Sequence, residues 1–566
     1  MIRIVELFSG IGSQAKAFSR LGVDYEVLKT CEWDFHSFMA YERIHRTPQM
    51  QPEVEAMTKA ELLTELQKYT LSTNGKTPVT FGTLRSITEN GLRWILSSIY
   101  NTNNCVSVTD LHSKDLPDNI DLMTYSFPCQ DLSNVGAFHG YNKGIDRDAE
   151  NRSGLLWEVE RVLWEMSEEK RDMPRFLLLE NVTALLSKRH RGNFEEWKSI
   201  LNTLGYTNKV YCLNALDFGL PQNRYRLMML SVYTGHDSEK ERFVEEYFRE
   251  HDLENGLYRA TLNIPVGNLE DYLRLDYSNE AYRREAEECQ PCDTPSRRKI
   301  WEHNAKLVDE TGRIIAGHVG TLTTKQDRDP NSGNIYMHPH DGLGNYRYLT
   351  PRECIMLMGF DESDYEKLIN NNPELKKDHC AFPRDRIIRM AGNSIAVNVL
   401  VEVFRQMMDI HGVFYPGRGR KSRASFDVHD KETRSYNMSQ IKAKHTKPEE
   451  TVAKYLFASK LRFRRNVKDL PGSPDIVLPK YKTVILVNGC FWHGHEGCKY
   501  FKWPKTNREF WEKKINTNQE RDRRKTKELE ELGWHVITIW ECDLKNDSEN
   551  TLLNLLNEIK SQPHKN

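Results

Sequence analysis

The sequence predicts an α/β protein with a doubly wound, Rossmann-like and largely parallel sheet, followed by a smaller C-terminal α/β domain. Strand-like apolar runs alternate with amphipathic helical patterns through the first part of the chain, which is typical of doubly wound folds. A chain of 566 residues is also longer than one hydrophobic core usually supports. We therefore expect at least two folded domains.

The composition argues against membrane and secreted proteins. No run approaches the roughly 20 apolar residues of a membrane-spanning helix, and Met1–Gly12 lacks the features of a signal peptide. The 11 cysteines are an odd number, which favours core residues, a nucleophile or metal ligands over a disulfide framework. We expect a cytoplasmic protein without a membrane partner.

Charge alone does not identify a partner. The net charge is −1, but a whole-chain average can hide a basic face. Basic residues gather near 418–423, 460–468 and 521–525. Because such runs are more often ordinary solvated faces, they do not decide between classes of protein.

The N-terminus carries a pattern that can hold an adenosine. An apolar strand, Ile2–Leu7, leads into a turn with Gly10 and Gly12, then a helix, and a second strand, Tyr25–Cys31, ends at Glu32. In α/β folds the glycines let the backbone approach the ligand, and the acid accepts hydrogen bonds from ribose hydroxyls. Tight packing alone could explain the glycines equally well.

Further strands are predicted at Asp121–Ser126, Phe176–Leu179 and Arg226–Ser231, with helical patterns at Leu155–Met166 and Phe194–Leu204.

A polar helical insertion, 52–100, carries no chemical signature. Regular alternation fails at 232–344 and returns after it, which indicates a separate lobe inserted into the first domain. The stretch 415–423, rich in glycine and basic residues, is the best candidate for a linker.

Three reactive side chains lie at the ends of predicted strands. Cys129 follows the strand ending at residue 126, Glu180 ends another strand, and Arg226 begins a third. Ligands of open α/β sheets bind outside the carboxyl ends of the strands, so we expect these side chains to converge there. A single cysteine is more often a buried, inert residue.

Taken together, the motifs resemble those of the DNA (cytosine-5) methyltransferases over nearly all of residues 1–410. They occur in the order of that family: Phe8-Ser9-Gly10-Ile11-Gly12, Glu32, Pro128-Cys129-Gln130, Glu180-Asn181-Val182, Gln222-x-Arg224-x-Arg226, Arg347-x-Leu349-Thr350-x-Arg352-Glu353 and Gly392-Asn393-Ser394. Ser13 departs from the pattern, since many relatives have another glycine there.

The resemblance implies methyl transfer from S-adenosylmethionine to C5 of a cytosine in double-stranded DNA. Cys129 would attack C6 as a thiolate, Glu180 would share a proton with N3, and Arg226 would hold O2. The cytosine must be flipped out of the duplex, and the glycine-containing segment 131–152 fits a loop closing over it.

The resemblance also implies a set of cofactor contacts, with Phe8 and Trp33 on either side of the adenine. The expected contacts are Phe8, Gly10, Gly12, Glu32, Trp33, Asp110 and Asn393. The inserted lobe would be the target recognition domain. The predicted boundaries are 1–233 for the catalytic domain, 234–345 for target recognition, 346–415 for the return segment, 416–425 for the linker and 426–566 for the second domain.

The second domain has the spacing of a zinc site. Thiolates and imidazoles within a few residues can fill a tetrahedral site together with a distant ligand. The candidate donors are Cys490, His493, His495, Cys498 and Cys542. More donors occur than four ligands require, so one histidine could serve catalysis. Upstream, Asp475 begins an apolar strand, where a carboxylate is a natural ligand for Mg²⁺.

Residues 425–545 resemble the very-short-patch repair (Vsr) endonucleases, on the cysteine cluster and the stretch from Asp427 to Met438. The resemblance implies that Asp475 binds catalytic Mg²⁺, that His493 is the general base and that Glu449 supports the site. Zinc would take Cys490, His495, Cys498 and Cys542. The apolar wedge at the mismatch would be Met438, Phe491 and Trp492. Asn488 departs from the histidine of familiar repair members.

These resemblances predict one bacterial or phage enzyme, acting as a monomer on DNA, that methylates cytosine and nicks the T·G mismatches left when 5-methylcytosine deaminates. Two alternatives remain open at the sequence level. The nuclease could cut unmethylated DNA, as in a restriction-modification fusion, or the domain could dock on a mismatch without cleaving it.

Overall fold

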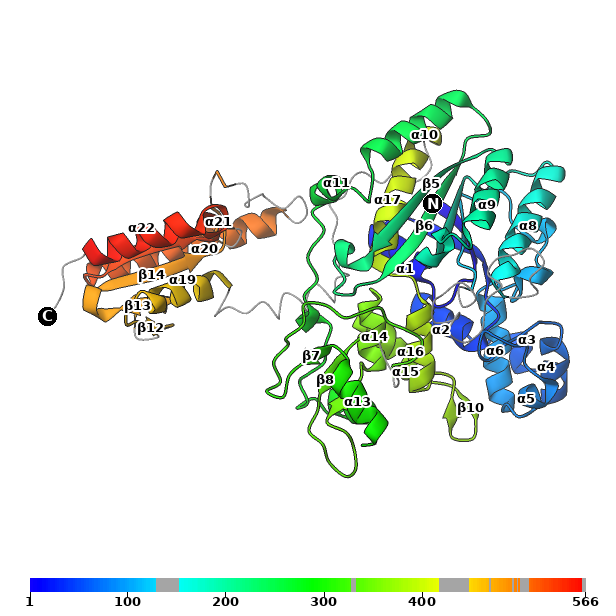
Figure 1. The fold of residues 1–566 in the computed structure, drawn as a ribbon, viewed down its shortest axis with the longest axis horizontal. Coiled ribbons are helices and arrows are strands. Elements are labelled where there is room, and N and C mark those ends of the chain that lie inside the picture. Colours follow the sequence, from blue (N-terminus) through cyan, green and yellow to red (C-terminus); the bar gives the residue numbers. More distant parts are fainter. Residues whose placement is uncertain are drawn as a thin grey trace. The chain divides into compact units, whose positions relative to one another are not determined.

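The computed structural model divides the chain into two compact units, Met1–Phe426 and Asp427–Asn566 (Figure 1). Each unit is described by itself. The described residues are 1–128, 152–326, 332–416, 447–467, 470–490, 493–495, 497–498 and 508–561.

A six-stranded sheet forms the centre of the first unit, in the order β2-β1-β3-β4-β6-β5. Its strands are β1 (Ile2–Leu7), β2 (Tyr25–Cys31), β3 (Leu122–Tyr125), β4 (Phe176–Asn181), β5 (Tyr206–Asn214) and β6 (Tyr225–Tyr233). β6 pairs antiparallel with both β4 and β5, and the other pairs are parallel. The predicted α/β class is confirmed, although the sheet is mixed and β5 was not anticipated from the sequence.

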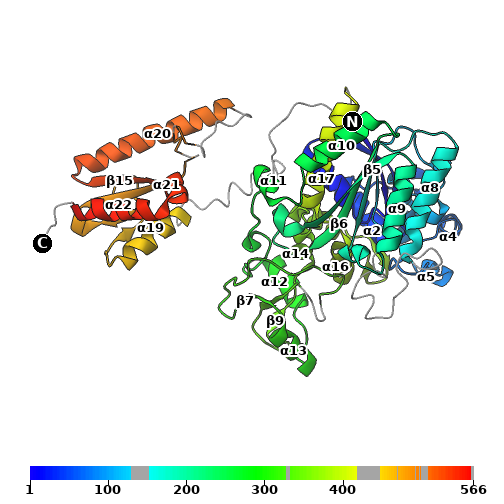
Figure 2. The ribbon, with the colours of Figure 1, turned by 45° about the horizontal axis from the view of Figure 1, so that its top comes forward.

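Helices cover both faces of this sheet because side chains of successive strand residues point to opposite faces. Ile2 and Ile4 of β1 belong to a core shared with α1 (Ser13–Leu21), α2 (Phe35–His45) and α17 (Val397–Phe414). Val5 and Leu7 belong to the opposite core, with α8 (Leu156–Glu168) and α9 (Arg191–Thr203). Figure 2 shows α8 and α9 on one side of β5 and β6 and α17 on the other.

The insertion before β3 is helical, as predicted. It comprises α3 (Pro52–Glu55), α4 (Lys59–Leu66), α5 (Phe81–Arg85) and α6 (Glu89–Asn101). Leu62, Leu66 and Leu92 are buried and join the same core as α2. The insertion is therefore part of the first unit's fold rather than an appendage.

The segment after β6 begins with a helix that belongs to the core. α10 (Ser238–Glu250) packs against β5, and Phe243 contacts Phe414 of α17 with ring centroids 5.4 Å apart. The lobe follows, with α11 (Gly256–Thr261), α12 (Glu280–Glu288), α13 (Pro295–His303) and the three-stranded sheet β7 (Lys306–Val308), β8 (Asn334–Tyr336) and β9 (Tyr346–Arg347).

A return segment connects the lobe back to the core. It contains α14 (Pro351–Leu357), α15 (Glu362–Ile369), the hairpin β10 (Glu374–Lys376) and β11 (His379–Cys380), and α16 (Arg384–Asn393), which is followed by α17.

A fully buried ion pair fastens the return segment. Both side chains of the Arg347–Glu353 pair are 0% exposed, and Arg347 donates to both carboxylate oxygens of Glu353 at 2.8 Å. Glu353 also accepts the backbone N–H of Thr350, the N-cap of α14, and that of Arg274 in the lobe. One carboxylate therefore satisfies donors from the lobe and the return segment.

The second unit has a four-stranded mixed sheet, β12-β13-β14-β15. The strands are β12 (Arg464–Arg465), β13 (Ile476–Leu478), β14 (Thr483–Asn488) and β15 (His535–Trp540), with helices α19 (Lys447–Ala458), α20 (Arg508–Glu531), α21 (Glu541–Asn546) and α22 (Ser548–Ser561). β14 and β15 are parallel, and the other pairs are antiparallel. The predicted C-terminal α/β domain is confirmed.

We predict that Glu353→Gln destabilises the first unit by about 3–5 kcal/mol, because it leaves the Arg347 charge buried without compensation. Urea unfolding followed by tryptophan fluorescence measures this. The matched control is Glu246→Gln, which removes an exposed ion pair of α10 and is expected to cost about 1 kcal/mol or less. Equal effects of the two substitutions would contradict the prediction.

Candidate active sites

The glycine turn after β1 has a conformation that few other residues could adopt. Gly10 and Gly12 have φ values of 53° and 81°, in the left-handed region. A Cβ atom on Gly12 would lie 2.3 Å from the imidazole of His45 and 2.7 Å from the ring of Tyr41. Glycine at this position therefore lets the turn pack directly against α2, where any side chain would collide with His45 and Tyr41.

Glu32 lies at the end of β2 and faces this turn. Its carboxylate accepts the N–H of Gly10 at 3.0 Å and that of Asp34 at 2.9 Å. Burial, together with the negative charge of Asp34, raises the pKa of Glu32 to about 7. The predicted acid thus stands beside the predicted glycine turn, with part of its accepting capacity already used by the backbone.

The insertion contributes a loop to this region that sequence analysis did not foresee. The N–H of Ser72 donates to the carbonyl of Trp33 at 2.7 Å, and the N–H of Phe35 donates to the carbonyl of Ser72 at 3.1 Å. Thr70 donates from its hydroxyl to Asp110 at 3.3 Å. The loop therefore borders both Trp33 and Asp110, which are expected cofactor contacts.

The structure brings Glu180 and Arg226 together. The Nε atom of Arg226 lies 3.4 Å from a carboxylate oxygen of Glu180, and the side chains are 17% and 10% exposed. Burial raises the pKa of Glu180, and the charges of Arg226 and Arg224 counter only part of this. The site thus holds a carboxyl group that keeps its proton more readily than an ordinary glutamate does.

The pairing follows from the direction of β6. Glu180 of β4 is opposite Met228, and Asn181 is opposite Leu227, so the start of antiparallel β6 lies at the carboxyl end of β4. Parallel β3 ends at the same edge, where Asn181 donates to the carbonyl of Phe127 at 3.1 Å. Cys129 itself lies outside the described residues, two positions after Phe127 in the sequence.

Other motif residues have structural roles. Gln222 is fully buried and bonds to Leu357 and Leu322. Arg224, 2% exposed, donates to the carbonyls of residues 322, 392 and 394. In the Gln222-x-Arg224-x-Arg226 motif, therefore, Arg226 forms the ion pair with Glu180, whereas Gln222 and Arg224 bind surrounding backbone groups.

Ser13 and Asn393 lie where the chain returns to the glycine turn. The hydroxyl of Ser13 accepts the N–H of Ile395 at 3.3 Å. A serine is thus accommodated here and ties α1 to the segment after α16. Asn393 is exposed at the end of α16.

A second group of reactive side chains lies in the C-terminal unit. Asp475, immediately before β13, accepts the N–H of Val487 at 2.8 Å. Burial raises the pKa of Asp475, the nearby charge of Glu449 raises it further, and His493 opposes this. Glu449 of α19 is 4% exposed. The fold therefore brings Asp475, Glu449 and His493 within electrostatic reach of one another.

Asp522 is a member of this site that the sequence analysis missed. Its carboxylate makes a short hydrogen bond with Nδ1 of His493. An acid on one ring nitrogen fixes the orientation of the imidazole and leaves the other nitrogen available. Asp522 lies in a basic stretch of α20, 29 residues from His493, and no local motif marks it.

The predicted zinc donors are assembled. The ligand atoms of Cys490, His495, Cys498 and Cys542 all lie within 4.8 Å of one another. The ring of His495 stacks on Trp540, with centroids 3.9 Å apart. Three sulfurs and one imidazole are a donor set that suits tetrahedral Zn²⁺. Among the candidate donors, His493 is separate from the cluster and pairs with Asp522.

Several predicted residues lie outside the described part of the chain. These are Cys129, Met438, Phe491 and Trp492, together with residues 131–151 of the expected closing loop.

The fold and these two groups of side chains define an α/β protein with a left-handed glycine turn beside an acid and a separate, metal-compatible acidic site. Residues 89–409 match the C-5 cytosine-specific DNA methylase family, and residues 426–499 match the DNA mismatch endonuclease Vsr family. The chain therefore belongs to the C-5 cytosine-specific DNA methylase family and carries a Vsr endonuclease domain.

Relatives match each unit. Orphan methyltransferase M.SssI of Spiroplasma monobiae is 32% identical over 420 residues, which cover 70% of this chain and 95% of that protein. Type II nicking enzyme V.NmeAIP of Neisseria meningitidis is 47% identical over 136 residues, 24% of this chain and 96% of that protein. DNA mismatch endonuclease Vsr of Escherichia coli is 50% identical over 119 residues, 21% of this chain and 76% of that protein.

Proposed function

We propose that this enzyme methylates C5 of a flipped-out cytosine in a specific duplex sequence and nicks T·G mismatches that arise from deaminated 5-methylcytosine. The observation that carries the first activity is the Glu180–Arg226 pair, at the same sheet edge where β3 leads to Cys129. The second rests on the Asp475, Glu449 and His493 site beside the Cys/His cluster.

Each side chain of the first site has a step in the reaction. The Cys129 thiolate adds to C6 of the cytosine, and negative charge spreads over the ring. Glu180, whose pKa is raised by burial, donates a proton to N3, and Arg226 donates a hydrogen bond to O2. S-adenosylmethionine supplies the methyl group to C5. S-adenosylhomocysteine is left behind, water takes the C5 proton, and the freed electron pair re-forms the C5–C6 double bond as the Cys129 thiolate leaves. The N3 proton returns to Glu180, which restores the starting state.

The residues around the glycine turn fit this cofactor. The close backbone approach at Gly10 and Gly12 and the acid at Glu32 suit an adenosine, whose ribose hydroxyls can donate to the carboxylate. Phe8 and Trp33 provide aromatic faces for the adenine, and Asp110 and Asn393 complete the contacts. The Thr70–Ser72 loop of the insertion forms one wall by holding Trp33 and Asp110.

The nuclease site is suited to a divalent cation. Glu449 is buried and Asp475 is partly buried, their charges repel, and Mg²⁺ would relieve this repulsion. His493, oriented by Asp522, would take a proton from the attacking water. Zn²⁺ would bind Cys490, His495, Cys498 and Cys542 and hold the ends of β14 and β15 together. Met438, Phe491 and Trp492 would form the wedge into the mismatch.

Fusion of the two activities gives the enzyme a way to correct its own mutagenic product. Deamination of 5-methylcytosine leaves thymine opposite guanine at the methylated site. A nick beside that thymine would start its replacement, so one chain would both make the modification and repair its decay product.

We predict that Cys129→Ser abolishes methyl transfer and that Glu180→Gln lowers kcat by about 10²–10⁴-fold, because proton donation to N3 is lost. Transfer of radiolabelled methyl from S-adenosylmethionine to duplex DNA measures both. Cys380→Ser, which changes an exposed cysteine, is the control and should keep normal activity. Full activity of Cys129→Ser would refute the mechanism.

We predict that S-adenosylmethionine binds roughly tenfold more tightly at about pH 8 than at about pH 6. Glu32 has a pKa of about 7, so raising the pH ionises the carboxylate that accepts the ribose hydroxyls. Calorimetric titration measures the affinity. Glu32→Gln should bind weakly with no such rise, and Asp34→Asn should move the transition to lower pH, because the Asp34 charge helps to raise this pKa. A flat wild-type profile would contradict the assignment.

We predict that the enzyme nicks a duplex containing T·G at the methylation site when Mg²⁺ is present, and that Asp475→Ala lowers the rate at least 10²-fold, because the cation loses its ligand. Gel electrophoresis of end-labelled duplexes measures the nick. Glu530→Gln, an exposed change on α20, is the control. Cleavage of fully paired, unmodified duplex would favour a restriction enzyme. Tight mismatch binding without cleavage would favour a docking domain.

A further inference from the structure

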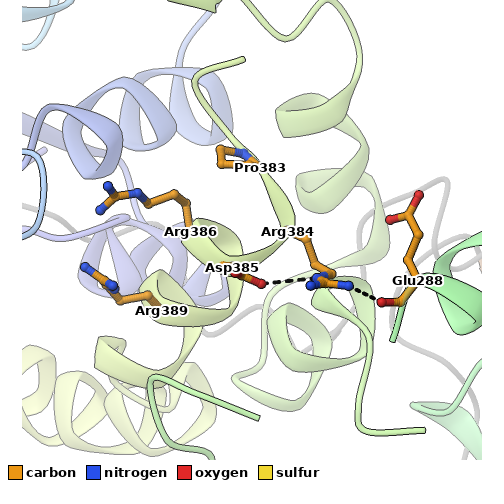
Figure 3. Close-up of a pocket in the computed structure, with 6 residues that line it drawn as sticks. All are labelled: Glu288, Pro383, Arg384, Asp385, Arg386 and Arg389. Atoms are coloured by element: carbon orange, nitrogen blue, oxygen red, sulfur yellow. Dashed lines mark hydrogen bonds and ion pairs between the residues drawn. The ribbon is translucent and has the colours of Figure 1, made fainter. Parts of the chain in front are cut away.

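A cavity of about 550 Å³ lies at α16, and none of its lining residues belongs to the two sites described above (Figure 3). Glu288, at the end of α12 in the lobe, lines one side, and α16 of the return segment lines the other. The lining residues are Glu288, Pro383, Arg384, Asp385, Arg386 and Arg389. The cavity is thus formed where the lobe meets the catalytic part of the first unit.

The three arginines are engaged to different degrees. Arg384 turns toward the lobe, where it donates to the carbonyl of Glu288, and it also pairs with Asp385 at 3.1 Å (Figure 3). Arg386 donates to the carbonyl of Thr73 in the insertion. Arg389 makes no hydrogen bond or ion pair with any residue that the structure describes. Its charge stabilises the ionised form of Asp34, and its guanidinium keeps hydrogen-bond donors for a ligand.

Arg386 and Arg389 extend to the same side of α16 (Figure 3). Burial lowers the pKa of Arg386, and the charge of Arg389 acts in the same direction, although Asp34 opposes both. An anion held by both guanidiniums would relieve their repulsion. Planar guanidinium groups match the oxygens of a phosphate, and charge-assisted hydrogen bonds of this kind are among the strong ones.

Helix α16, which lines the cavity, is linked to the methyltransferase site by a short stretch of sequence and one hydrogen bond. Arg389 precedes Gly392 by three residues, a rise of about 4.5 Å along α16. The carbonyl of Gly392 accepts Arg224, two residues before Arg226. A duplex that presents a base to Glu180 and Arg226 must bring its backbone along the adjoining surface.

We propose that Arg386 and Arg389 bind a backbone phosphate of the double-stranded DNA substrate. This inference rests on the proposed methyltransferase function. Phosphate contacts fix the position of a duplex without reading its sequence. The site would therefore hold the DNA in register between the lobe and the catalytic part, whatever bases the lobe selects.

The test is equilibrium binding of the full-length protein to a mixed-sequence duplex between about 50 and about 200 mM KCl, with EDTA and without cofactor. Arg389→Ala should weaken binding roughly three- to tenfold, equally for all sequences, and lower the slope of log K against log salt by about 1. Arg389→Lys keeps the charge and should keep the slope. Arg249→Ala, which removes an exposed arginine of α10, is the matched control and should change neither quantity.

A second experiment tests whether the phosphate bound by these arginines belongs to the DNA backbone. Neutral methylphosphonates placed singly along the duplex should weaken wild-type binding at one position, with no further loss in Arg389→Ala. An unchanged salt slope in Arg389→Ala would overturn the proposal, as would weaker binding of inorganic phosphate or S-adenosylmethionine without an effect on DNA. Because no methyl transfer or nicking is measured, failure of this test and failure of the proposed function are distinguishable.

Discussion

The antiparallel pairing of β6 with β4 is the constraint on which the methyltransferase site depends. In an all-parallel sheet the start of a strand lies at the opposite edge from the end of its neighbour. Because β6 is reversed, Arg226 at its start stands beside Glu180 at the end of β4. The reversal follows from a β5–β6 hairpin, whose connection contains the buried residues Gln222 and Arg224.

Burial of acidic groups is common to the sites of both units. Glu32, Glu180 and Asp475 all have raised pKa values, with burial as the largest cause. Each group is therefore less stable in its charged form than it would be in water, which is a cost that the rest of the fold offsets. The consequence differs by site: Glu180 is favoured as a proton donor, whereas Asp475 and Glu449 favour a cation that neutralises them.

The lobe and the insertion both reach the central site through a few polar contacts. Glu353 bonds to Arg274 of the lobe, and Arg224 bonds to Leu322. The insertion reaches Trp33 through Ser72 and reaches Asp110 through Thr70. Both segments thus contact residues near the ends of the central strands without adding a strand to the central sheet.

The sequence alone was sufficient to predict those features whose chemistry and local structure depend on residues that are neighbours in the chain. The strand, glycine turn and acid at Glu32 follow a local pattern, and so does the run from Cys490 to Cys498. The assignment of Cys129 rests on such a pattern and on the family, because the residue lies outside the described part of the chain. In the glycine turn, for example, the backbone conformation is set within a few positions.

Only the tertiary structure determined the features that depend on pairing between segments far apart in the sequence. Strand β5, the direction of β6, the contact of Ser72 with Trp33 and the pairing of Asp522 with His493 leave no periodic signal in the sequence. Each joins segments whose separation along the chain says nothing of their distance in space. The physical reason is that hydrogen bonds and charges act over a few ångströms, and only the packed core determines which side chains come that close.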